Sequence, residues 1–264
     1  MDLITSTQNP RIKNLLQLEK ARNRKKEKVF VIEGFREIER ALQSGYEFEN
    51  LYYCPEIENF KYQGFVEKFP IRDKIAVSDN VFTRIAYRDK HEGLVATAKM
   101  KEHRIEDFTT PENGLYLVIE SVEKPGNLGA LLRTADAAGL DAVFICDNQT
   151  DIYNPNVIRS SLGCLFSNKV IVSSANELVN FFKANEIAIY ASALQQSDIY
   201  YNADFGKANA IVMGSEAQGL SEAWRENAEK IIRIPMKGIA DSLNVSASAA
   251  ILIFEAIRQR RDRT

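Results

Sequence analysis

Hydrophobic positions along the chain alternate between short apolar runs and longer stretches in which they recur every three or four residues. The runs VFVIE (29–33), LYLVIE (115–120) and AVFIC (142–146) are typical of buried strands. The stretches GFREIERALQSG (34–45) and 175–184 have the spacing of amphipathic helices. This alternation predicts an α/β protein with a mostly parallel sheet in its C-terminal part.

The N-terminal part follows the same pattern on a smaller scale. After a helix expected over residues 10–27, short strands and helices alternate up to about residue 100. The polar stretch KEHRIEDFTTPENG contains Pro111 and Gly114 and is expected to be a linker. A chain of 264 residues is long for one hydrophobic core. We therefore expect two domains, over residues 1–108 and 109–264.

The second domain is expected to form a three-layer α/β sheet. Helices are expected over 127–138 and 156–165, followed by the strands KVIVS, IAIYAS, AIVMG and KIIRIP and by a long closing helix. In open sheets of this kind, ligands bind beyond the carboxyl ends of the strands. The loops that follow LYLVIE, AIVM and KIIRI are therefore the first places to look for a site.

Composition narrows the class of protein. With 45% hydrophobic residues and no apolar run of bilayer length, a cytoplasmic protein is expected. Cys54, Cys146 and Cys164 are expected to be reduced and buried. His91 and His103 are the only histidines, and no metal-ligand spacing is present, so no metal site is expected. The sequence also lacks the G-x-S-x-G motif of a serine hydrolase.

The net charge of −2 hides a strongly basic N-terminal stretch. Basic residues outnumber acidic ones between residues 9 and 28, and such a stretch can bind the phosphates of a nucleic acid. A solvated helix explains the same charges equally well. The candidate RNA contacts are Arg22, Arg24, Lys25, Lys26 and Lys28.

The loop GSEAQGLS resembles a phosphate-binding loop in its glycine spacing, but Leu220 stands where the essential lysine would be. Glu216 inside the loop would repel a polyphosphate, so hydrolysis of ATP or GTP is disfavoured and a neutral or cationic ligand fits better. The turn GNLG lacks the dinucleotide fingerprint, which argues against a nicotinamide cofactor. Taken singly, each loop also has an ordinary explanation as a turn or a helix cap.

Together, KPGNLGALLRTADAAG, VMGSEAQGLS and IPMKGIADSLNVSASAA resemble the three signature motifs of the SpoU-TrmH family in the SPOUT superfamily. The likeness runs from about Leu115 to Ala256, and the segments EGFREIERAL and HEGLVA resemble an L30e-like substrate-binding domain. The resemblance implies an L30e-like α/β domain followed by a SPOUT domain with a C-terminal trefoil knot. It also implies S-adenosylmethionine as cofactor, a ribose 2'-hydroxyl of RNA as methyl acceptor, and a homodimer with its sites near the subunit interface.

The resemblance carries over to individual positions. The positions that match cofactor contacts are Leu194, Gly214, Ile234, Met236 and Leu243. The positions that match the catalytic set are Asn127, Arg133, Glu216, Ser242 and Asn244. Arginine is a poor base, so Arg133 is expected to stabilise the developing alkoxide and to hold a phosphate, with Glu216 anchoring it; a role as base stays open.

Several alternatives remain beside ribose methylation of ribosomal RNA. They are methylation of transfer RNA, methylation of a base, and a catalytically inactive RNA-binding relative. The last alternative would usually lack Arg133, Glu216 or Asn244, all of which are present. The resemblance of SLN (242–244) to the family motif favours the ribose over the base.

Overall fold

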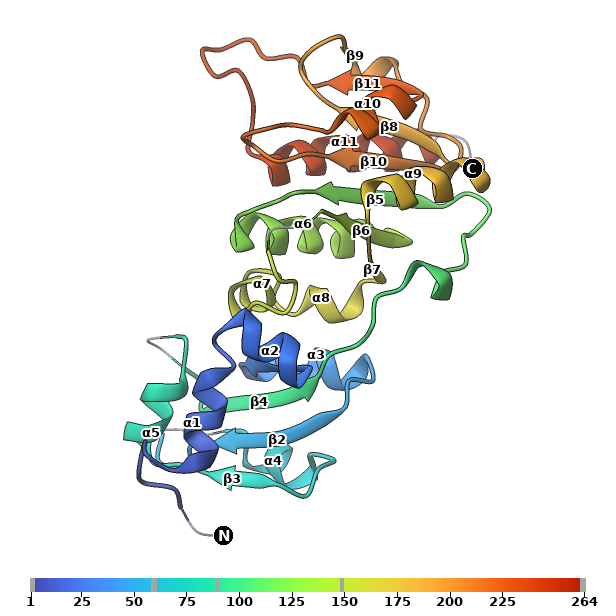
Figure 1. Cartoon of the computed structure of the whole chain (residues 1–264). Coiled ribbons are helices and arrows are strands. Elements are labelled where there is room, and N and C mark those ends of the chain that lie inside the picture. Colours follow the sequence, from blue (N-terminus) through green and yellow to red (C-terminus); the bar gives the residue numbers. More distant parts are fainter. Residues whose placement is uncertain (1–2, 58–60, 89–90, 148–149, 262–264) are drawn as a thin grey trace. The chain divides into compact units, whose positions relative to one another are not determined.

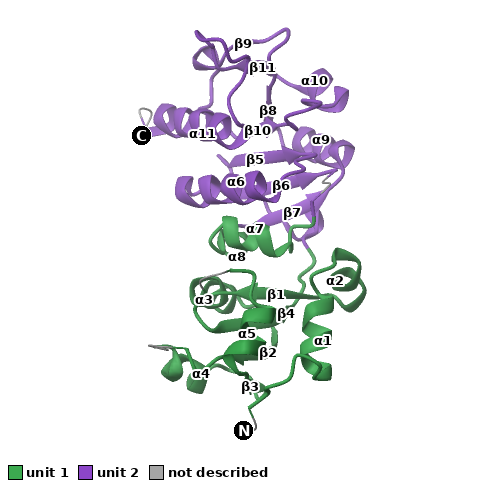
Figure 2. Ribbon diagram, turned by 90° about the vertical axis from the view of Figure 1, so that its left-hand side faces the viewer, with its two compact units in different colours: residues 1–102, 151–167 green, residues 103–150, 168–264 purple. Residues whose placement is uncertain are grey.

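The computed structural model describes residues 3–57, 61–88, 91–147 and 150–261. The chain divides into two compact units (Figure 1; Figure 2). Unit 1 contains residues 1–102 together with the segment 151–167, and unit 2 contains the remainder. This division differs from a single boundary after residue 108, because the segment 151–167 packs with the N-terminal part of the chain.

Unit 1 is built on a four-stranded mixed sheet. Its strands are β1 (Val29–Glu33), β2 (Phe48–Tyr53), β3 (Lys74–Ala76) and β4 (Leu94–Lys99). Its helices are α1 (Pro10–Gln17), α2 (Ala21–Glu27), α3 (Phe35–Gln43), α4 (Gln63–Lys68), α5 (Asp79–Ile85), α7 (Pro155–Ser160) and α8 (Cys164–Ser167). The strand order is β1-β4-β2-β3, in which β4 is antiparallel to β1 and β2. Apolar residues of β1 and β2 are buried, as their sequence predicts.

The prediction of one continuous helix over residues 10–27 is wrong, because the chain turns between α1 and α2. Lys20 has extended backbone angles, with φ −86° and ψ 125°. The Arg24 side chain folds back onto this turn, where Nη1 donates to the carbonyl oxygens of Leu18 and Glu19 at 2.7 Å each. Leu18 at this turn is buried in the same cluster as Leu15 of α1.

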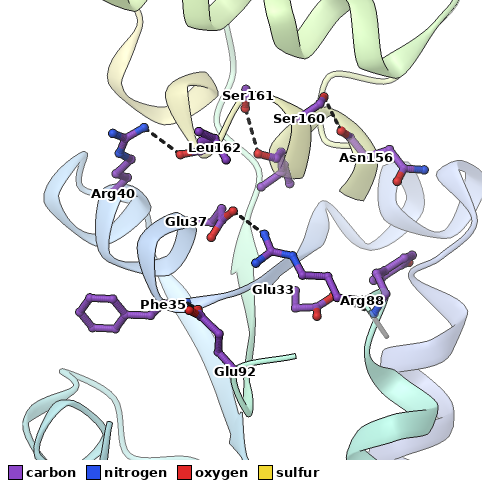
Figure 3. Close-up of polar contacts among 12 residues, drawn as sticks. Glu33, Phe35, Glu37, Arg40, Arg88, Glu92, Asn156, Ser160, Ser161 and Leu162 are labelled. Carbon is purple, nitrogen blue, oxygen red and sulfur yellow. Dashed lines mark hydrogen bonds and ion pairs between the residues drawn. The ribbon is translucent and has the colours of Figure 1, made fainter. Parts of the chain in front are cut away.

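The helix expected over 156–165 is also interrupted. Leu162 and Gly163 have positive φ angles of 54° and 79°, which end α7 and separate it from α8. A Cβ atom at Gly163 would lie 3.2 Å from the Cα atom of Glu37 in α3. Arg40 of α3 donates to the carbonyl oxygen of Leu162 at 2.8 Å (Figure 3). The segment 151–167 is thus joined to unit 1 by close packing at the break.

Unit 2 is built on a seven-stranded sheet in the order β7-β6-β5-β10-β8-β11-β9, in which every pairing between described strands is parallel. The strands are β5 (Leu115–Glu120), β6 (Ala142–Cys146), β7 (Val170–Ser173), β8 (Ala188–Ser192), β9 (Asp198–Ile199), β10 (Asn209–Met213) and β11 (Lys230–Arg233). The mostly parallel α/β sheet expected for this part of the chain is confirmed.

Helices cover the sheet of unit 2 on both faces, so its central strands are buried throughout. They are α6 (Pro125–Ala138), α9 (Ala175–Ala184), α10 (Glu222–Asn227) and α11 (Val245–Arg261), with 3₁₀ turns η1 (Ile105–Asp107) and η2 (Tyr200–Asn202). The helices α6 and α11 pack together on one face, and α9 and α10 pack together on the other (Figure 2).

Two further expectations concern the cysteines and the membrane. Cys54, Cys146 and Cys164 are all buried, and none of the three forms a disulfide with another described residue, which agrees with the prediction of reduced thiols in the interior. Burial raises the pKa of the Cys54 thiol, which makes it a poor nucleophile. Among the described helices, none combines the length and the apolar character needed to span a bilayer.

Candidate functional site

The loop that follows β10 folds back onto its own start. A Cβ atom at Gly214 would lie 2.3 Å from the carbonyl oxygen of Gly219, so only glycine fits there. The amide of Gly219 donates to the carbonyl of Ser215 at 3.0 Å, and the two residues form an antiparallel bridge. Gly219 itself has a φ of +69°, a conformation that favours glycine. The two glycines of GSEAQGLS thus shape a tight turn.

The far end of this loop is tied to the neighbouring strand. Glu120, the last residue of β5, is only 3% exposed. Its carboxylate accepts from the Ser221 hydroxyl at 2.6 Å and from the Ser221 amide at 2.8 Å. Because Ser221 also begins α10, the same contact fixes the start of that helix.

A cavity of about 380 Å³ lies at the carboxyl ends of β8, β10 and β11. In the sheet, β8 lies between the other two strands, and all three run parallel, so their following loops meet at one edge. All the positions matched to cofactor contacts line this cavity: Leu194, Gly214, Ile234, Met236 and Leu243. Ser242 and Glu216 line it too, which gives it a mixed apolar and polar wall.

A second cavity of about 310 Å³ adjoins the first. Ser215, Glu216, Ala217 and Val245 line both cavities, so this short stretch and the start of α11 form the wall between them. The second cavity is also lined by Asn127 and by other residues between 122 and 127. Two adjoining cavities with a shared polar wall suit a reaction between two bound molecules.

Glu216 is the centre of a polar network at this wall. Its Oε1 accepts from the side-chain amide of Asn127 at 2.9 Å and from that of Asn244 at 3.1 Å. The same Asn244 amide donates to Oδ1 of Asn127 at 3.1 Å. Lys124 Nζ lies 3.0 Å from Glu216 Oε2, and this hydrogen bond is the largest cause that lowers the pKa of Glu216. Glu216 is therefore held as a carboxylate.

The network narrows one expectation. Within one copy of the chain Glu216 does not contact Arg133; the described side-chain partners of Glu216 are Lys124 and the two asparagines. Arg133 lies six residues after Asn127 in α6, a rotation of about 600° about the helix axis, so the two side chains leave the helix on different faces. Arg133 is exposed and lines neither cavity, and its side chain has no hydrogen bond or ion pair with another described residue.

The structure also adds residues that the sequence patterns did not single out. Lys124 comes directly before α6, the helix that begins with PGN. Its place in the motif KPGNLG was the one signal in the sequence for a role of this lysine. Arg225 and Arg233 line the larger cavity as well. No periodicity or motif points to these two arginines, because they reach the cavity from α10 and β11 only through the tertiary fold.

One group of possible metal ligands exists among the described residues. Glu120, Cys146 and Asp147 bring ligand atoms within 4.8 Å of one another. Both oxygens of Glu120 already accept hydrogen bonds from Ser221, and Asp147 accepts from the Ala175 amide at 3.2 Å. Burial raises the pKa of the Cys146 thiol, which favours its protonated form. These contacts give the three side chains structural roles.

The basic surface predicted near the N-terminus needs one correction. Arg22, Lys25, Lys26 and Lys28 are exposed. Arg24 is buried, with a side chain only 1% exposed, and its Nη2 lies 2.8 Å from Asp151 Oδ2. A guanidinium committed to this ion pair and to the turn between α1 and α2 has no access to a phosphate, so Arg24 is removed from the candidate RNA contacts.

Comparison with known proteins gives matches over both parts of the chain. Residues 114–254 match the SpoU rRNA Methylase family. Residues 9–96 match the MRM3-like substrate binding domain. The first match contains all the residues that line the two cavities, and the second contains the basic N-terminal stretch.

Full-length relatives resemble the chain over nearly its whole extent. The 23S rRNA (guanosine(2553)-2'-O)-methyltransferase RlmP of Bacillus subtilis (strain 168) is 28% identical, over 96% of this chain and 98% of that protein. A crystal structure of an RNA 2'-O ribose methyltransferase has a TM-score of 0.86 and 41% identity, over 98% of this chain and 100% of the other. The SpoU methyltransferase AviRb of Streptomyces viridochromogenes, solved with AdoMet, has a TM-score of 0.88 and 26% identity, over 96% and 99%.

Proposed function

Because the chain belongs to the SpoU rRNA methylase family, we propose that it transfers a methyl group from S-adenosylmethionine to a ribose 2'-hydroxyl of ribosomal RNA. The observation that carries this proposal is the network of Asn127, Glu216 and Asn244 in the wall between two adjoining cavities. One cavity would hold the methyl donor and the other the target nucleotide. We propose that the reaction involves no metal ion. We also propose that the protein acts in the cytoplasm.

The larger cavity fits the proposed cofactor. Its volume of about 380 Å³ falls in the usual range for sites of small ligands, roughly 300–1,000 Å³. Leu194, Ile234 and Leu243 offer apolar contact to an adenine ring, and the absence of a side chain at Gly214 lets backbone groups approach it. The Glu216 carboxylate tolerates the positive charge of a sulfonium, which would repel a lysine in the same place.

Methyl transfer requires the hydroxyl oxygen, the methyl carbon and the sulfur to lie in line. S-adenosylmethionine, when bound, supplies the electrophilic methyl group. The amides of Asn127 and Asn244 are fixed by their bonds to Glu216, so they can orient the ribose at low cost in entropy. Glu216 is a poor acceptor for the hydroxyl proton, because its lowered pKa makes the carboxylate a weak base. As the bond from oxygen to the methyl carbon forms and the bond from carbon to sulfur breaks, the proton therefore passes to solvent water, and the cofactor leaves as the neutral thioether.

We assign Arg133 to a site shared between two copies of the chain. Arg133 lies outside both cavities of its own protomer, on an exposed part of α6. Phe254 on α11, the helix that packs with α6, is 50% exposed, which suits a surface covered by a second copy. In the proposed homodimer, Arg133 of one copy reaches the acceptor cavity of the other, where it stabilises the developing alkoxide and holds a phosphate.

The exposed cations Arg22, Lys25, Lys26 and Lys28 are proposed to bind RNA phosphates in unit 1. The trefoil knot in the C-terminal part is likewise proposed. Support for the knot comes from the match of residues 114–254 to the SpoU rRNA Methylase family, and not from the strand order, since unknotted parallel sheets also insert late strands between earlier ones, as β10 is inserted between β5 and β8.

The proposal is tested with purified protein, S-adenosylmethionine carrying a labelled methyl group, and deproteinised ribosomal or transfer RNA. The RNA is digested to nucleosides, and the label is located by mass spectrometry. Label on the ribose of ribosomal RNA alone supports the proposal. Label on a base, or on transfer RNA only, contradicts it. Calorimetric titration with S-adenosylmethionine and with magnesium ATP distinguishes a methyltransferase from a nucleotide hydrolase. We expect S-adenosylmethionine to bind and magnesium ATP not to bind.

A further inference from the structure

Arg225 is a cation in the wall of the larger cavity whose hydrogen-bonding capacity is largely unused. Its described contact is a long hydrogen bond from Nη2 to the carbonyl oxygen of Gln195, at 3.5 Å. None of the described carboxylates forms an ion pair with it. A guanidinium carries five N–H donors, so Arg225 keeps donors for a ligand in the cavity that it lines.

The fold holds Arg225 in this place from two sides. At the start of α10, Ser221 is bonded to the buried Glu120. Trp224, the residue before Arg225, is fully buried in the core of unit 2. With its start tied and one face packed, α10 has no freedom to rotate Arg225 away from the cavity. Such preorganisation is what a charged binding contact requires.

Of the two cations in the wall of the cavity, Arg225 makes fewer described hydrogen bonds within the chain than Arg233. Arg233 also lines the cavity, but its Nη1 donates to the carbonyl oxygen and to the hydroxyl of Ser197, the latter at 3.2 Å. Glu216 is the carboxylate in the wall, and it stands beside the acceptor cavity. The larger cavity therefore has the Glu216 carboxylate on the side shared with the acceptor cavity, which the methyl group must face, and the Arg225 guanidinium at another part of its wall.

This distribution of charge matches S-adenosylmethionine, which has a sulfonium at its centre and a carboxylate at the end of its methionyl arm. We infer that Arg225 binds this carboxylate and thereby sets the orientation of the cofactor, an inference that rests on the proposed function. With the carboxylate held at Arg225 and the adenosine against Leu194, Ile234 and Leu243, the methyl group is left facing the wall at Glu216. Arg225 is then a positioning residue that selects cofactors with a carboxylate.

The test compares S-adenosylmethionine with decarboxylated S-adenosylmethionine, which keeps the sulfonium, the adenosine and the amine. Both are titrated calorimetrically into the wild type, Arg225→Gln, Arg225→Lys and, as a matched control, Lys237→Gln. Lys237 is an exposed cation in the loop after β11 that does not line the cavity. A charged hydrogen bond corresponds to a preference of roughly ten- to hundredfold for the carboxylated ligand in the wild type.

In Arg225→Gln this preference should fall close to one, through weaker binding of S-adenosylmethionine alone, while Arg225→Lys should keep part of it and Lys237→Gln all of it. Equal affinity of the wild type for both ligands would overturn the inference and leave the cofactor assignment intact. An equal loss for both ligands in Arg225→Gln would overturn it as well, since Arg225 would then only shape the cavity. Failure of the wild type to bind S-adenosylmethionine would instead refute the proposed function.

Discussion

The side-chain amide of Asn244 lies 3.1 Å from the carboxylate of Glu216, although 28 residues separate them. Asn244 stands directly before α11, and Glu216 lies in the loop after β10. Their contact joins two loops that leave the sheet at the same edge, and it makes the shared wall of the two cavities one hydrogen-bonded unit. A change to either side chain should therefore affect the acceptor side of the site more than the affinity for the cofactor.

The ionisation of Glu216 should depend on Lys124. The pKa of Glu216 is below its ordinary value of 4.5, chiefly because Lys124 donates to the carboxylate. A lowered pKa means that the network is fully formed above pH 4.5 and is lost only as the pH falls through the pKa of the folded state. A carbon NMR titration of the Glu216 carboxyl should give a midpoint below 4.5, and Lys124→Gln should raise it. A midpoint that does not move would remove Lys124 from the account.

Arg133→Ala should abolish methyl transfer while S-adenosylmethionine still binds with normal affinity, because Arg133 does not line the cofactor cavity. Glu216→Ala should also abolish transfer. If Arg133 acts across the interface, mixing the two inactive variants creates heterodimers in which one site has both side chains. In an equal mixture that exchanges subunits freely, activity should recover to roughly a quarter of the wild type, by the symmetry of the proposed dimer.

The control for this mixing experiment is Glu216→Ala mixed with Asn127→Ala, two changes within one protomer's network. These heterodimers contain no complete site, so activity should stay absent. Recovery in the control, or no recovery with Arg133→Ala despite exchange of subunits, would contradict the assignment of Arg133 to the partner's site.

Gly214→Ala should prevent cofactor binding, because the new Cβ atom would press against backbone atoms of Gly219 and Leu220. Overpacking of this kind costs about 1–3 kcal/mol in stability. Gly238→Ala is the matched control, since a Cβ atom there meets nothing within 4 Å and its φ is not positive. Thermal unfolding and calorimetric titration should separate the two variants; equal behaviour would show that the loop after β10 is more adaptable than its contacts indicate.

In the basic N-terminal stretch, we expect Arg24 to stabilise the fold and the exposed cations to bind RNA. Arg24→Met should lower the free energy of unfolding by about 3–5 kcal/mol, because it leaves Asp151 without its buried partner. Arg22→Met, at an exposed position, should change it by no more than about 0.5 kcal/mol. Chemical denaturation measures both.

Charge reversal at Lys25, Lys26 and Lys28 together should weaken RNA binding and leave stability nearly unchanged. The dependence of log affinity on log salt should become shallower by up to roughly one per lysine that contacts a phosphate. A slope equal to that of the wild type would show that these lysines form only a solvated surface.

Local patterns predicted the strands and helices whose limits depend on their own residues. β5 and α9 begin and end where the apolar run and the helical spacing do, at 115–120 and 175–184. The breaks near Leu18 and at Leu162 were not predictable in this way, because they depend on distant groups. Arg24 supports the first break and contacts Asp151, and Gly163 at the second packs against Glu37.

In the candidate site, too, the sequence patterns identified individual residues but did not predict the contacts between distant ones. The motifs identified Asn127, Glu216 and Asn244, and the structure joins them by hydrogen bonds. The part played by Arg225 follows only from tertiary geometry, and the place of Lys124 in the motif does not predict its contact with Glu216. Arg133 lies apart from the network because Asn127 and Arg133 occupy different faces of α6.

The most direct test of the central claim is a transcriptome-wide map of 2'-O-methylated nucleotides in RNA from cells that lack this gene. The account predicts that one ribose methylation in ribosomal RNA disappears, and that purified wild-type protein with S-adenosylmethionine restores it on the extracted RNA while Glu216→Ala does not. An unchanged map of ribosomal RNA, or a missing methyl group on a base, would contradict the account.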